Sequence, residues 1–141
     1  MHDTNETIFI VDDDPSVLKS LTRLIRAGGW NVEPYASGRE FLARLPFSGR
    51  GCVILDLMMP DMSGLEVCSQ MAALCPSLPT ILLTGGDDFK LRATAASGPA
   101  VNFVDFVTKP VDGEILLSGI RRALAPQGTS RIDFIGGPSR T

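Results

Sequence analysis

The sequence is poor in the residues that form disulfides or bind zinc. Its 141 residues include three cysteines and one histidine, and the cysteines lack the paired spacing of a zinc site or a disulfide framework. We interpret Cys52 and Cys68 as small buried hydrophobes of a reducing compartment. No apolar run approaches the ~20 residues of a membrane span, and no basic-then-apolar leader opens the chain, so we expect a cytoplasmic protein without membrane contact.

Basic charge is also scarce. Lys and Arg total 13 against 16 Asp and Glu, a net charge of -3. This balance offers no positive surface for a phosphate backbone, so we expect no direct nucleic-acid binding. The 44% hydrophobic fraction suits one compact domain, since a chain of this length can bury about two-thirds of its unfolded surface.

Short apolar runs alternate with segments of helical periodicity. A parallel sheet covered by helices on both faces requires this alternation, because its strands are buried on both sides. Strands are predicted at 7–11, 31–36, 52–55, 80–84 and 102–108. Helices are predicted around Val17 to Ile25, around Phe41 to Leu45, at 64–75, and through Ile115, Leu116, Ile120 and Leu124.

Capping residues support two of these helices. Asp14 before Pro15 is typical of a helix N-terminus, and Ser37 with Glu40 predicts a capping box. Gly28-Gly29 is expected to end the first helix. The helix at 64–75 is predicted to bury an apolar face made of Leu65, Val67, Cys68, Met71, Ala72 and Leu74.

Polar residues stand where the predicted strands end. Asp12 and Asp13 follow the first strand, Asp56 the third, Thr84 the fourth, and Lys109 the fifth. Such sheets bind ligands beyond the carboxyl ends of their strands. Two carboxylates about 4 Å apart repel by roughly 4 kcal/mol at an effective dielectric near 20, so this cluster invites a hard divalent cation, Mg²⁺ above all.

Four motifs in order carry a family resemblance: "IVDDD" at 10–14, "LDLMMPDMSG" at 55–64, "LLTG" at 82–85 and "FVTKP" at 106–110. Each ends its own predicted strand, and together they resemble the receiver domain of two-component response regulators. The resemblance covers residues 7 to about 125. It implies an α/β fold of the flavodoxin-like kind, doubly wound, with five parallel strands in the order 2-1-3-4-5.

The resemblance also implies roles for individual residues. Asp56 matches the phosphoacceptor, Asp13 a direct magnesium ligand, and Asp12 an acid that holds the metal through water. The remaining matches are the backbone carbonyl of Met58 in the metal site, Thr84 as the switch hydroxyl, Lys109 as the partner of the phosphoryl group, Phe106 as the switch aromatic, and a cis bond between Lys109 and Pro110.

A receiver domain implies partners of a defined kind. The donor is a sensor histidine kinase or a phosphotransfer protein, the recipient of the signal is an output domain or protein, and phosphorylation-dependent homodimers are expected. Such a domain is no enzyme beyond slow self-dephosphorylation. Two other hypotheses remain. One is a magnesium-dependent phosphohydrolase with Asp56 as nucleophile, although this chain lacks a second acid two residues after Asp56. The other is an interaction module that is never phosphorylated.

Two segments depart from the regular pattern. Six residues, "PAVNFV", separate Gly98 from Asp105, more than receivers usually have, so we expect the fourth helix to be shortened or displaced and to end at Gly98-Pro99. We place the receiver domain at 1–125. The Gly-, Pro- and Ser-rich stretch at 126–141 is expected to be a tail or the stub of a linker, so the chain is either a stand-alone regulator or a receiver taken from a longer protein.

Overall fold

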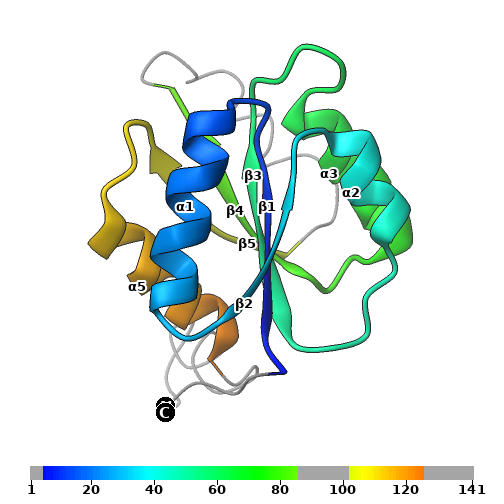
Figure 1. Ribbon diagram of the computed structural model, residues 1–141. Coiled ribbons are helices and arrows are strands. Elements are labelled where there is room, and N and C mark those ends of the chain that lie inside the picture. The colour runs from blue at the N-terminus through cyan, green and yellow to red at the C-terminus, as the bar shows by residue number, and fades with distance from the viewer. Residues whose placement is uncertain (1–4, 86–101, 126–141) are drawn as a thin grey trace, which may run out of the picture.

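Five strands and four helices form the part of the chain that the structure describes. A computed structural model describes residues 5–85 and 102–125 (Figure 1). The predicted fourth helix and the predicted tail fall at 86–101 and 126–141, outside the described residues. The elements are β1 (Thr7–Val11), α1 (Pro15–Ala27), β2 (Asn31–Tyr35), α2 (Gly38–Arg44), β3 (Gly51–Asp56), α3 (Gly64–Leu74), β4 (Pro79–Thr84), β5 (Asn102–Thr108) and α5 (Gly113–Leu124).

The strands form one parallel sheet in the order β2-β1-β3-β4-β5, which confirms the predicted fold. Helices α1 and α5 cover one face of the sheet, and α2 and α3 cover the other (Figure 1). Alternate residues of β1 therefore enter different cores: Ile8 and Ile10 pack with α1 and α5, whereas Phe9 and Val11 pack with α2 and α3. Burial on both faces explains why the inner strands β1 and β3 are apolar without a polar alternation.

The helices begin at side-chain caps. Asp14 accepts a hydrogen bond from Ser16 N at 2.9 Å at the start of α1, as predicted. Ser37 accepts from Glu40 N at the start of α2, which is one of the two bonds of the capping box predicted there. Both bonds of such a box form at α3, between Ser63 and Glu66, where the sequence analysis did not predict one.

A bulge interrupts the pairing of β4 with β5. Thr80 pairs with Phe103 and Ile81 with Asp105, so Val104 is an extra residue in β5. Val104 and Phe106 would share a face in a regular strand, but here they pack into different cores. The bulge instead places Phe103 and Phe106 together, with stacked rings whose centroids lie 6.1 Å apart.

Two apolar residues predicted in buried helical stripes are exposed. Leu74 is 42% exposed, because Cys75 and Leu78, just after α3, take the buried positions there. Ile115 is 53% exposed, because α5 turns its neighbour Leu116 and the residues on that side toward the sheet. All three cysteines are free and buried, which confirms the prediction for Cys52 and Cys68.

Helices in the described ranges are all too short, or too polar, to cross a membrane.

Candidate functional site

The register of the sheet brings two acids together. Val11 of β1 lies opposite Leu55 of β3, so the residues that follow them, Asp12 and Asp56, leave neighbouring strands side by side, about 4.8 Å apart in the strand spacing. Carboxylate oxygens of Asp12, Asp13 and Asp56 lie within 4.8 Å of one another. Asp12 is fully buried and Asp56 is 4% exposed, whereas Asp13 is exposed to solvent.

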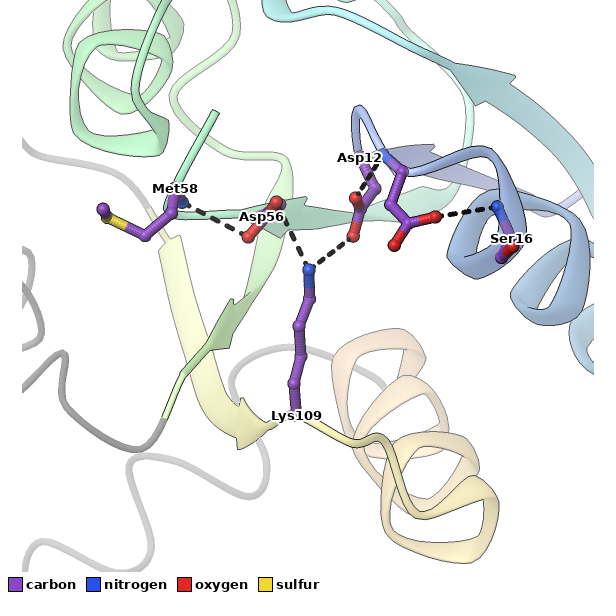
Figure 2. Close-up of polar contacts among 6 residues, drawn as sticks. Asp12, Ser16, Asp56, Met58 and Lys109 are labelled. Carbon is purple, nitrogen blue, oxygen red and sulfur yellow. Dashed lines mark hydrogen bonds and ion pairs between the residues drawn. The ribbon is translucent and has the colours of Figure 1, made fainter. Parts of the chain in front are cut away.

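Lys109, which directly follows β5, completes this cluster. Its backbone N–H donates to the Thr84 carbonyl at 2.7 Å, which holds the start of the side chain beside the end of β4. The ammonium then reaches back between the acids, with Nζ 3.0 Å from Asp12 Oδ2 and 3.4 Å from Asp56 Oδ2 (Figure 2). The contact with Asp12 is an ion pair without hydrogen-bond alignment, since Oδ2 accepts no hydrogen bond from the described residues.

Backbone amides fix the other oxygen of each buried acid. Met58 N donates to Asp56 Oδ1 at 3.2 Å, and Asp14 N donates to Asp12 Oδ1 at 2.9 Å. The Met58 side chain points away from Asp56 in Figure 2 and is 57% exposed. Each buried carboxylate is thus held by an amide on one oxygen and faces the same ammonium with the other.

The environment changes the proton affinity of two groups. Burial, reinforced by the charge of Asp12, raises the pKa of Asp56 to about 6, against the opposing effects of Lys109 and the Met58 amide. Burial alone would lower the pKa of Lys109, but the ion pairs with Asp12 and Asp56 outweigh it and raise that pKa. The lysine therefore stays protonated, and ionisation of Asp56 is less favourable in the folded protein than in water.

The cluster suits a divalent cation. The cluster contains three carboxylates and one ammonium, so two negative charges remain uncompensated when all the acids are ionised. Magnesium prefers oxygen ligands and retains several waters, which the exposed side of Asp13 would admit. The residues present therefore fit the ion.

The two predicted switch residues lie on β4 and β5. Thr84 ends β4, is fully buried, and its hydroxyl has no hydrogen-bond partner among the described residues. Phe106 is half-buried and stacks on Phe103. The Lys109-Pro110 bond is cis, as predicted.

Sequence reasoning missed the two amides that orient the acids. Asp14 was predicted only as a helix cap, and Met58 only through its carbonyl. Their amides orient Asp12 and Asp56. The signal available was the turn that follows each strand, where backbone N–H groups have no partner in the sheet.

Gly64 also supports this loop. A Cβ at this position would lie 2.6 Å from the Asp56 carbonyl oxygen, so the start of α3 approaches the end of β3 too closely for a side chain. Its N–H donates to the Leu57 carbonyl at 2.9 Å. Gly64 therefore fixes the backbone that carries Asp56 and Met58.

Comparisons with known proteins identify the family to which this chain is related. Residues 8–121 match the model of the response regulator receiver domain family. The chain is 42% identical over 132 residues to the response regulator protein TodT of Pseudomonas putida, covering 92% of this chain and 57% of that protein. It is 36% identical over 120 residues to the transcriptional regulatory protein FixJ of Rhizobium meliloti, covering 85% of this chain and 57% of FixJ.

A solved structure agrees in fold as well. The crystal structure of FixJ-N superposes with a TM-score of 0.76 at 36% identity, covering 87% of this chain and 94% of that one. The chain thus spans 57% of the length of TodT and FixJ. With the family model matched over most of its length, the chain belongs to the response regulator receiver domain family.

Proposed function

We propose that this receiver domain accepts a phosphoryl group on Asp56 from a phosphohistidine of a sensor histidine kinase or a phosphotransfer protein. The proposal rests on one observation above all: the buried Asp56 carboxylate lies 3.4 Å from the Lys109 ammonium and within 4.8 Å of the carboxylates of Asp12 and Asp13. As a receiver domain, the chain is a signalling domain rather than an enzyme in the ordinary sense.

The transfer needs positioning more than activation. A carboxylate oxygen of Asp56 forms a bond to phosphorus, the phosphorus–nitrogen bond to the donor histidine breaks, and its electron pair stays on the imidazole. The product is an acyl phosphate on Asp56. Lys109, already 3.4 Å from this carboxylate, would pair with the equatorial oxygens, where charge accumulates in the transition state.

Magnesium would be held by Asp13 and Asp56 directly, by Asp12 through water, and by the backbone carbonyl of Met58. When bound, the ion would supply positive charge that, together with Lys109, neutralises the phosphoryl oxygens. Asp12 and Asp56 are oriented by amides before any ion binds, so the chain itself supplies most of the arrangement.

The phosphorylated site would favour a second conformation. A phosphoryl group carries close to two negative charges and strong acceptor oxygens. Thr84 has a buried hydroxyl without a partner in the described residues, so it is ready to donate to that group. Its inward movement would open space for the Phe106 ring and carry the signal to the surface of β5.

The output is proposed to lie outside this domain. FixJ is a transcriptional regulatory protein, and this chain spans about half the length of such relatives. We therefore propose that an output domain or a partner protein controls transcription in response to Asp56, in the cytoplasm, and that phosphorylated copies pair. The receiver itself contacts no nucleic acid in this proposal.

Intact-mass measurement tests the function. Incubation with acetyl phosphate and Mg²⁺ should add one phosphoryl group, and Asp56→Asn should abolish the adduct. The matched control is Asp61→Asn, which removes an exposed acid of the same loop and should leave the adduct intact. No adduct in the unmodified chain would refute the proposal in favour of an interaction module, and sustained turnover of phosphate esters would favour a phosphohydrolase.

A further inference from the structure

A groove opens at the edge of the sheet opposite the acidic site. It has a volume of about 450 Å³ and is lined by Gly51, Pro79 and Asn102, which begin β3, β4 and β5. Because the strands are parallel, Asp56 and Thr84 lie at their other ends. The groove is therefore separate from the phosphoacceptor site, and what binds there need not affect the chemistry of Asp56.

Most of the side chains that define the groove are apolar. Phe47, Cys75, Leu78 and Leu124 line it, and Cys75 donates a weak hydrogen bond to the Phe47 carbonyl at 3.5 Å. Apolar surface of this kind gains free energy when another apolar group removes it from water. The groove thus suits a short segment that carries apolar side chains.

The chain itself delivers such a segment. Leu124 and Ala125, the last described residues, form part of the groove wall, so the following residues start at its rim. Between 126 and 141 the large apolar side chains are Ile132, Phe134 and Ile135, within the run "RIDFI". The stretch from Ala125 to Phe134 can span up to about 30 Å when extended, ample for a return to a groove that Ala125 already lines.

Charge favours the same segment. Arg50 lines the groove with its side chain 54% exposed. Its Nη2 contacts Glu6 Oε2 at 3.1 Å and the Leu124 carbonyl. A guanidinium has five N–H donors in all, so donors remain for a further carboxylate. Asp133 lies between the apolar residues of "RIDFI" and would meet this cation.

We propose that residues 131–135 of this chain bind in the groove, with Phe134 against Cys75 and Leu78, and Asp133 beside Arg50. The bound segment covers the apolar surface at the base of the sheet. It also fixes the direction in which the chain continues after α5, which sets the position of whatever follows the receiver.

Alkylation of Cys75 in the full chain tests this proposal. Iodoacetamide is applied under native conditions, and each cysteine is followed by peptide mass spectrometry. Phe134→Ser should raise the alkylation rate of Cys75 about tenfold or more, because thiol reactivity follows exposure. Cys52 and Cys68 should stay unmodified, since burial raises their pKa to about 12 and about 11, and this shows that the domain remains folded.

A matched pair of variants tests the ionic contact. Asp133→Asn, which removes the carboxylate proposed to face Arg50, should raise the alkylation rate of Cys75 severalfold, whereas Ser139→Lys changes the net charge of the chain by the same amount beyond the segment and should not. Equal Cys75 rates in the unmodified chain and Phe134→Ser would overturn the proposal. If the protection of Cys75 from alkylation in the unmodified chain disappears on dilution, the proposal is also overturned, because the groove would then be occupied by a second copy of the chain. Neither result depends on phosphorylation of Asp56.

Discussion

Replacing Asp56 with asparagine is expected to stabilise the metal-free protein, although it removes the proposed phosphoacceptor. Asn keeps the shape of the side chain, and its carbonyl oxygen can still accept from Met58 N, now 3.2 Å from Asp56 Oδ1. The substitution removes a buried charge that lies near Asp12. Lys109 loses its partner at 3.4 Å but keeps Asp12 at 3.0 Å, so no cation is left without a partner.

The size of the gain follows from the pKa of Asp56. Its value of about 6 in the fold exceeds the ordinary 3.8, so the folded state binds this proton more tightly than the unfolded state. The corresponding stability is fully present below pH 3.8 and is lost as the pH rises through 6. At about 1.4 kcal/mol per pKa unit, the ionised carboxylate costs up to about 3 kcal/mol at pH 8. We expect Asp56→Asn to recover about 1–3 kcal/mol there and little near pH 4.

Urea unfolding in EDTA measures this difference. Trp30, the single tryptophan, is 4% exposed and reports unfolding by its fluorescence. Asp61→Asn, at an exposed acid of the same loop, should change stability by less than about 0.5 kcal/mol. A gain from Asp56→Asn below about 0.5 kcal/mol at pH 8, or an equal gain at pH 4, would show that Asp56 carries no burial penalty. Added Mg²⁺ should reduce the difference in the free energy of unfolding between Asp56→Asn and the unmodified chain, because only the site that keeps the Asp56 carboxylate is expected to gain stability from the ion.

Three further substitutions probe the supports of the site. Lys109→Met leaves the carboxylates of Asp12 and Asp56 without their ammonium. The lysine side chain is 29% exposed, and this partial exposure limits the expected loss in the free energy of unfolding of the metal-free protein at pH 8, measured in urea, to about 1–3 kcal/mol. No loss would mean that solvent fully screens the ion pairs. Gly64→Ala places a Cβ 2.6 Å from the Asp56 carbonyl oxygen and should cost about 2 kcal/mol or more, with a fully stable variant contradicting the close approach. Thr84→Val removes a hydroxyl without a partner in the described residues, so the free energy of unfolding of the unphosphorylated protein should change by less than about 1 kcal/mol. The effect of phosphorylation on hydrogen exchange in β5 should become smaller. An undiminished effect would exclude the switch role.

Local sequence patterns were sufficient for the elements. Each predicted strand lies within two residues of the observed one at either end. In β1 and β3 the reason is that an apolar run buried on both faces ends abruptly at an acid. The acids were predictable for the same reason: Asp12 and Asp56 each follow or end such a run, and parallel strands deliver their carboxyl ends to one edge. Lys109 was predictable at the same edge because it follows the fifth strand, but its role beside Asp56 came only from the motif around it.

Contacts between distant residues were not predictable in this way. The extra residue Val104 changes which face of β5 Phe106 occupies, and regular strand periodicity gives no sign of it. The contacts of the buried Glu6 with Trp30 and Arg50 join three segments that share no sequence pattern. Leu74 was misassigned because its burial depends on the space that Cys75 and Leu78 already fill.

The sequence by itself determined the order and kind of the elements and the set of chemical groups at the sheet edge, because periodicity and strand ends are properties of neighbouring residues. Tertiary structure alone decided that one ammonium lies between two buried carboxylates, that Asp13 faces solvent while Asp12 does not, and that a groove opens at the opposite edge. Charge, burial and open space at a point depend on every segment that packs there, and these segments come from distant parts of the chain.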